Sequence, residues 1–183
     1  MSSILGVVCA RRGSKRFPGK KLAEIDGISL VERAVRTLNR AGLNDIVVAT
    51  DFDLEFDPVQ YGAIHLRRSP NASDDNIALQ DTVKWAYLSM QRPYEHIVFL
   101  MPNCPMVTVD CARKAMKLLL EKKYNVVRSY SENGFENGLV AVKTSYFLNH
   151  YIDVYCGGCV CEGDEIHDEQ DYLKIKRRLE AAQ

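Results

Sequence analysis

The chain has 183 residues and no net formal charge, because 24 lysine and arginine residues balance 24 aspartate and glutamate residues. This balance argues against general nucleic-acid binding, which relies on a broad basic surface. Hydrophobic residues make up 46% of the sequence, and no apolar run approaches the ~18 residues needed to span a bilayer. The N-terminus also lacks the charged, apolar and small-residue order of a signal peptide. We therefore expect a single cytoplasmic domain over residues 1–183, with no membrane or nucleic-acid partner.

Short apolar runs alternate with amphipathic segments along most of the chain. The runs that indicate buried strands lie at 4–10, 45–50, 62–68, 96–101, 125–130 and 138–143. Helices are predicted at 29–42, from Asp74 or Asp75 to about residue 90, at 108–122, at 144–150, and from Asp168 onward. This alternation predicts an α/β fold in which helices cover both faces of a mainly parallel sheet. In such sheets the ligand binds at the carboxyl ends of the strands.

A cluster of positive charge follows the first expected strand, at the edge where a ligand is expected. Its six cations are Arg11, Arg12, Lys15, Arg16, Lys20 and Lys21. The dinucleotide fingerprint G-x-G-x-x-G is absent, and the five residues between Gly13 and Gly19 do not fit the Walker A spacing. A basic run is often only a solvated loop. The adjoining strand, glycines and prolines favour a site for a compact anion instead.

The stretch ARRGSKRFPGKKL, residues 10–22, resembles the signature loop of the cytidylyltransferases that activate sugar acids. These are the CMP-sialic acid (acylneuraminate) synthetases and the related 3-deoxy-manno-octulosonate enzymes, whose loop has the form A-R-x-x-S-x-R-x-P-x-K. The positions that fall in place are Ala10, Arg11, Gly13, Ser14, Lys15, Pro18 and Lys20. Further segments at 69–88, 100–107, 135–142 and 165–179 are similar to later family motifs and occur in the same order.

The resemblance implies a nucleotide-diphospho-sugar transferase-like, Rossmann-like fold. It also implies that the anomeric hydroxyl of a sugar acid attacks the α-phosphorus of CTP and releases pyrophosphate. Arg11 and Lys20 would be catalytic, because they would hold the triphosphate and stabilise the departing charge. Backbone N–H groups around Gly13 and Ser14 would form an anion-binding nest.

The resemblance extends to the other ligands. The residues expected to bind nucleotide are Ala10, Arg11, Gly13, Ser14, Lys15, Lys20, Lys21 and Arg68. Asn137 and Gly138 are expected to bind the sugar, and Glu165 and Asp168 to hold Mg²⁺. A homodimer is also implied.

The sequence departs from the family pattern at several positions. Met101 replaces a glutamine, Asn103-Cys104 replaces Thr-Ser, and Leu79 stands where a serine often helps to read the base. His167 falls within the acidic motif, although histidine is a poor Mg²⁺ ligand. The lobe around 131–165 is shorter than in typical members. Two alternatives therefore stay open: a sister nucleotidyltransferase with another base or sugar phosphate, and a nucleotide-binding module without turnover.

The six cysteines are expected to be reduced thiols, as is usual in a cytoplasmic chain. CGGCVC at 156–161 resembles a metal knuckle, but a structural zinc site needs four ligands and only His167 lies nearby as an extra candidate. We therefore expect a turn of small residues beside a buried strand.

Overall fold

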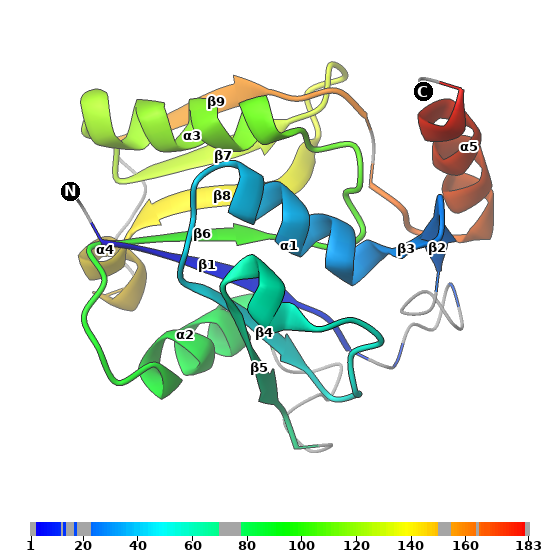
Figure 1. The fold of residues 1–183 in the computed structure, drawn as a ribbon. Helices are drawn as coiled ribbons and strands as arrows, with labels where there is room; N and C mark the ends of the chain where they lie inside the picture. Colours follow the sequence, from blue (N-terminus) through cyan, green and yellow to red (C-terminus); the bar gives the residue numbers. More distant parts are fainter. Residues whose placement is uncertain are drawn as a thin grey trace.

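Figure 1 shows a sheet covered by helices on both faces. The computed structural model describes residues 3–11, 13, 17, 23–69, 78–149, 155–163 and 165–181. The sheet has seven strands in the order β5-β4-β1-β6-β8-β7-β9. Their bounds are β1 Ile4–Cys9, β4 Ile46–Thr50, β5 Ala63–Arg67, β6 His96–Leu100, β7 Val126–Tyr130, β8 Glu136–Lys143 and β9 Cys156–Val160.

The sheet is mainly parallel, as the sequence predicts. Strand β1 pairs in parallel with both β4 and β6, and β7 pairs in parallel with β9. Strand β8 runs antiparallel to its neighbours β6 and β7. The start of β8 therefore lies at the same edge of the sheet as the carboxyl ends of the parallel strands.

The inner strands β1, β4 and β6 are buried on both faces, which explains why they form continuous apolar runs. On β1, Leu5 and Val7 face the layer of α2 (Leu79–Ser89) and α4 (Thr144–Asn149). Val8 faces the opposite layer, formed by α1 (Leu30–Arg40) and α3 (Val109–Glu121). Alternate residues of one strand thus support two separate cores, and Figure 1 shows the helix pairs on opposite sides of the sheet.

A third, smaller core lies beyond the carboxyl ends of the parallel strands (Figure 1). It joins the hairpin of β2 (Glu24–Ile25) and β3 (Ile28–Ser29) to helix α5 (Glu169–Glu180). Its buried side chains include Ile25, Ile166 and Ile175. The Tyr172 hydroxyl on α5 also donates a 2.6 Å hydrogen bond to the carbonyl of Glu24. The last helix is therefore anchored beside the edge formed by the carboxyl ends of the parallel strands.

Three elements differ from the sequence-based expectations. The β2–β3 hairpin was not predicted, because each of its strands has only two residues. Residues 156–160 form the edge strand β9 rather than the expected turn, because their backbone pairs with β7. Helix α2 begins at Leu79, and its cap residue Ala78 makes no side-chain hydrogen bond. The predicted caps, Asp74 and Asp75, lie outside the described residues.

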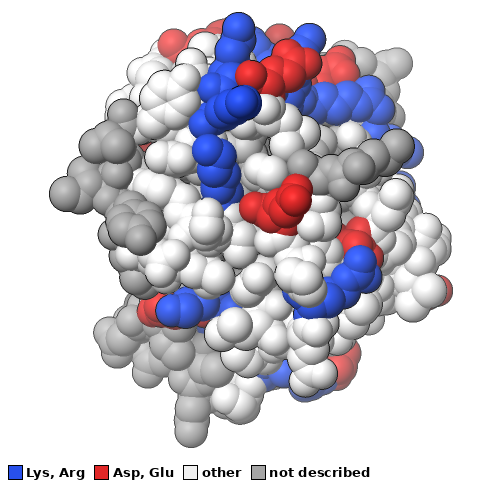
Figure 2. Space-filling model, turned by 90° about the vertical axis from the view of Figure 1, so that its left-hand side faces the viewer, with Lys and Arg blue, Asp and Glu red and all other residues white. Residues whose placement is uncertain are grey.

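One face of the molecule carries charges of both signs. Figure 2 shows the face on which the N-terminus and α4 lie, and there basic side chains stand beside acidic ones among many uncharged residues. Of the helices that the structure describes, none combines the length and hydropathy needed to cross a membrane.

Candidate functional site

Two arginines meet at the carboxyl ends of β1, β4 and β5. The backbone N–H of Ala10 donates to the carbonyl of Ala49 at 3.0 Å, so β1 stays paired until the basic segment begins. The N–H of Arg68 donates to the carbonyl of Thr50 at 2.7 Å, which places Arg68 one step beyond β5. Arg11 is exposed, whereas Arg68 is only 7% exposed. The sheet thus brings together two predicted nucleotide-binding residues that are far apart in the sequence.

The surroundings of Arg68 are electrostatically mixed. Burial lowers the pKa of Arg68. The charges of Cys9 and Asp51 act in the opposite direction and raise it, whereas the positive charge of Arg11 lowers it further. Burial also raises the pKa of the Cys9 thiol to about 12, so this thiol stays neutral at physiological pH. The positive charges of Arg11 and Arg68 outweigh the single carboxylate of Asp51, so this group favours an anion.

Asp51 is a member of this group that sequence reasoning missed. It affects the pKa of Arg68, so its carboxylate lies near the guanidinium. The signal in the sequence was its position directly after the buried strand β4, at the edge where ligands are expected.

The turn after β6 packs tightly against the start of β8. The N–H of Met101 donates to the carbonyl of Gly138 at 2.9 Å. Gly138 has a φ of +79°, and a Cβ at this position would lie 2.5 Å from Cys104 Sγ and 3.1 Å from Met101 Cβ. Only glycine fits there without displacement. Close packing alone therefore explains why residue 138 is a glycine, independently of its predicted contact with the sugar.

The same turn contacts the acidic segment. The Asn103 side-chain amide donates to Glu165 Oε1, and the backbone N–H of Ile166 donates to the carbonyl of Asn103 at 2.8 Å. On its other side, Glu165 Oε2 lies 3.9 Å from His167 Nε2. Asn103, known from the sequence only as a departure from the family pattern, is thus the residue that positions Glu165.

Asp168 caps helix α5. Its Oδ1 accepts a 3.0 Å hydrogen bond from the N–H of Asp171, and Asp171 in turn accepts from the backbone of Asp168, which completes a capping box. The cap predicted from the sequence is confirmed. The geometry gives Asp168 a structural role that is separate from its predicted role as a metal ligand.

Asn137 is almost completely buried, at 2% exposure. Its side-chain N–H₂ donates to the carbonyls of Cys161 and Gly163 at 3.3 and 3.4 Å. Its Oδ1 is buried and has no hydrogen-bond partner among the described residues. An unsatisfied buried carbonyl oxygen is costly, and Oδ1 is an acceptor that the described residues leave unused.

The basic loop itself is described only in part. Ser14, Lys15, Lys20 and Lys21 lie outside the described residues, so their predicted roles are untested. Gly13 is exposed and has open space where a Cβ would point. Phe17 packs against Tyr172 on α5, with the ring centroids 5.4 Å apart. This contact brings the loop beside the helix whose first turn follows the acidic segment.

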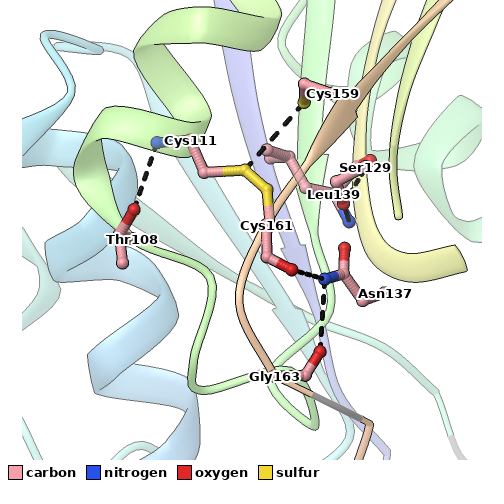
Figure 3. The surroundings of a disulfide bond; sticks show 8 residues. All are labelled: Thr108, Cys111, Ser129, Asn137, Leu139, Cys159, Cys161 and Gly163. Carbon is pink, nitrogen blue, oxygen red and sulfur yellow. Dashed lines mark hydrogen bonds between the residues drawn. A yellow bond between two sulfur atoms is a disulfide. The ribbon is translucent and has the colours of Figure 1, made fainter. Parts of the chain in front are cut away.

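One disulfide corrects the expectation that all cysteines are reduced. Cys111 on α3 is bonded to Cys161, which follows β9, across 50 residues of sequence (Figure 3). The sequence could not indicate this pair, because the fold alone brings α3 against the end of β9. Buried Cys159 lies beside the pair and is not in a disulfide. His167 does not join this sulfur group, which contains only cysteines among the described residues.

Comparison with known proteins agrees with this architecture. A family model described as cytidylyltransferase matches residues 5–150. The chain is 27% identical over 157 residues to the pseudaminic acid cytidylyltransferase of Campylobacter jejuni, an alignment that covers 82% of this chain and 66% of the relative. It is 29% identical over 135 residues to the 3-deoxy-manno-octulosonate cytidylyltransferase of Francisella tularensis, covering 72% and 52%.

A solved structure shares the fold over its whole length. The CMP:2-keto-3-deoxy-manno-octonic acid synthetase in complex with CTP superimposes with a TM-score of 0.75 at 15% identity, and the match covers 100% of both chains. In sequence, however, the chain spans less than two thirds of the length of the curated relatives named above. The family model matches most of the chain, and the chain therefore belongs to the cytidylyltransferase family.

Proposed function

We propose that this protein transfers CMP from CTP to a sugar acid of the nonulosonic or octulosonic class and releases pyrophosphate. The single observation that carries the proposal is the match of the cytidylyltransferase family model to residues 5–150, which includes the basic loop after β1. The names of the relatives, which act on pseudaminic acid and 3-deoxy-manno-octulosonate, indicate the substrate class.

The triphosphate would bind at the positive group that follows β1. Arg11 is exposed and can form a bidentate contact to phosphate oxygens, and Lys20 would supply a point charge. Arg68, held in a buried position, would keep the local potential positive. These groups would stabilise the charge that develops on the departing pyrophosphate. The reaction would then depend on positioning and electrostatics rather than on a protein nucleophile.

The sugar acid would bind near the start of β8. The unsatisfied Oδ1 of Asn137 would accept a hydrogen bond from a sugar hydroxyl, and the backbone of Gly138 would lie beside it. The shorter lobe at 131–165 would leave fewer contacts to the sugar than in longer relatives. Any homodimer, which the family resemblance implies, would be measured by analytical ultracentrifugation.

Mg²⁺ is the metal that we propose for the reaction. Glu165 offers a carboxylate with 22% side-chain exposure, held by Asn103. Asp168 is the second candidate, although it caps α5. Mg²⁺ is often bound by one or two carboxylates together with substrate phosphates and water, so this donor set fits. When bound there, the ion would neutralise phosphate oxygens, while Asn103 holds the Glu165 carboxylate in place.

The test is an assay of pyrophosphate release with CTP, Mg²⁺ and a panel of acids that includes pseudaminic acid, N-acetylneuraminic acid and 3-deoxy-manno-octulosonate. The proposal expects release with at least one acid and none without acid. Absence of release with every acid would exclude it.

A second candidate is a sister nucleotidyltransferase that uses another base. Met101 and Leu79 differ from the family's base-reading positions, and Leu79 packs against the core under α2. Thermal shifts with CTP, UTP, GTP and ATP separate the two candidates, since stabilisation by a purine nucleotide alone would favour the second. CTP binding without turnover would instead indicate a nucleotide-binding module.

A further inference from the structure

Three buried sulfur atoms gather where α3 meets the end of β9. The ligand atoms of Cys111, Cys159 and Cys161 all lie within 4.8 Å of one another. The three residues are 6%, 2% and 4% exposed, respectively. Figure 3 shows the three side chains converging from the helix and from the strand. This cluster plays no part in the proposed transferase reaction.

The Cys-x-Cys spacing explains why both strand cysteines point inward. Successive side chains of a strand alternate between its two faces. Val160, between the two cysteines, is 62% exposed, whereas both neighbours are buried. Cys159 and Cys161 therefore both face α3. A single structural disulfide to Cys111 would need only one of these two cysteines.

The distances suit coordination of one ion. Zinc–thiolate bonds of about 2.3 Å place the sulfurs of a tetrahedral site roughly 3.8 Å apart. The observed distance between Cys111 Sγ and Cys159 Sγ is 3.9 Å. The Cα atoms of Cys111 and Cys161 lie 5.9 Å apart. After reduction, side-chain rotation can separate their sulfur atoms to the spacing of two ligands.

The position of Cys111 favours the thiolate that metal binding requires. It lies in the first turn of the 13-residue helix α3, where its N–H donates to the Thr108 hydroxyl at 3.2 Å. The partial positive charge at a helix N-terminus stabilises a thiolate. A divalent ion bound there would displace the thiol protons.

From this geometry we propose that Cys111, Cys159 and Cys161 bind one zinc ion as thiolates, releasing their thiol protons, once an external dithiol has reduced the Cys111–Cys161 disulfide by supplying two electrons and two protons and has itself become a disulfide. Thiolate ligands select zinc and other soft ions. No fourth His, Cys, Asp or Glu joins the group among the described residues. Water or a small ligand would fill the fourth position, as in other zinc sites with three protein ligands.

Zinc at this point would fasten the sheet edge to the candidate active site. Among the described residues, strand β9 is the last strand of the sheet and pairs with β7. Asn137 binds the carbonyls of Cys161 and Gly163, and the chain then continues to Glu165. A metal bridge from α3 to Cys161 would therefore hold the segment that carries the acidic motif.

The test uses the full chain, fully reduced under anaerobic conditions and titrated with Co²⁺ as a spectroscopic substitute for zinc. The proposal expects one equivalent of Co²⁺ per chain, with thiolate-to-cobalt charge-transfer absorption and the visible bands of a tetrahedral ion. Zinc should displace the cobalt, and should raise the thermal unfolding midpoint of the reduced protein.

The decisive variant is Cys159→Ser, because it leaves the disulfide pair intact. The proposal expects the zinc affinity of this variant, measured by competition with a chromogenic chelator, to fall by more than roughly 100-fold. Loss of a residue that only supports a metal ligand typically costs roughly 10–100-fold, and Cys159 is proposed as a ligand itself. Cys156→Ser, on the same strand at an exposed position, is the matched control and should bind as the wild type does.

Two results would overturn the proposal. One is a folded, reduced wild-type protein that binds neither cobalt nor zinc. The other is unchanged binding in Cys159→Ser. If a variant fails to fold, the titration of the wild-type protein alone still tests the proposal.

Discussion

Replacement of Gly138 by alanine tests the tight contact between β8 and the turn after β6. The φ of +79° places this residue in the left-handed region, which costs an L-residue about 1–2 kcal/mol. The added Cβ would also lie 2.5 Å from Cys104 Sγ, inside normal contact, and overpacking of this kind costs about 1–3 kcal/mol. We expect Gly138→Ala to lower the free energy of unfolding by about 2–5 kcal/mol, which is the sum of these two costs.

Gly134 provides a matched control, because it isolates the steric part of the effect. Its φ is +82°, and no atom lies within 4 Å of the point that an added Cβ would occupy. Gly134→Ala should therefore carry only the backbone cost, about 1–2 kcal/mol. Urea denaturation of both variants measures the difference, and for a chain of this size each kcal/mol also shifts the thermal midpoint by about 2–4 °C.

A second substitution identifies the clashing neighbour. Cys104→Ala removes the sulfur nearest to the new methyl group, so the double variant with Gly138→Ala should recover part of the lost stability. A double-mutant cycle measures this coupling, which we expect to be about 1 kcal/mol or more. If Gly138→Ala cost no more than Gly134→Ala, or if the cycle showed no coupling, the packing argument would be wrong.

Three further predictions concern charge and capping. Arg11→Ala should lower the rate of pyrophosphate release by about 10²–10³ without lowering the thermal midpoint, because Arg11 is exposed, and Lys117→Ala at an exposed position of α3 is the control that should change neither. Asp168→Ala should cost about 0.5–2 kcal/mol in thermal unfolding through loss of the α5 cap, and an unchanged midpoint would contradict that role. Burial lowers the pKa of His96 below 6.5 in the folded protein, so stability should fall as pH drops below about 6.5. The slope should be at most about 1.4 kcal/mol per pH unit for this group. His96→Gln should flatten the urea-midpoint profile between pH 7.5 and the folded pKa, and an unchanged profile would refute the assignment.

The α/β architecture followed from periodicity because its elements have long apolar runs. Strands such as β1 and β4 are buried on both faces, so each forms a continuous hydrophobic segment that local sequence reveals. Helix α1 was recognisable from the Ser29 cap and its apolar face, and the structure confirms both. Mainly parallel pairing followed from the alternation of strands and helices.

Elements without such local patterns were missed. The β2–β3 hairpin has two residues in each strand, which is too short for any periodic signal. Strand β9 contains two glycines and only one buried residue, and its extended form depends on pairing with β7. Tertiary pairing, rather than intrinsic propensity, determines such a segment.

Site residues that belong to one local motif were predictable from the sequence. Site residues that are distant in the sequence and meet only in the folded chain were not. Ala10 and Arg11 were recognisable because they follow β1 directly. The interaction between Asn103 and Glu165 spans 62 residues, so no local pattern indicates it. The same holds for the disulfide between Cys111 and Cys161.

The most direct test of the account is a calorimetric titration of the protein with CTP and Mg²⁺, repeated with Arg11→Ala and Lys20→Ala. The account predicts that the wild-type chain binds one CTP. It also predicts that each variant binds at least about tenfold more weakly, since a charge-assisted hydrogen bond contributes roughly 1.5–3 kcal/mol. Equal affinity in all three proteins would mean that the basic loop after β1 does not hold the triphosphate.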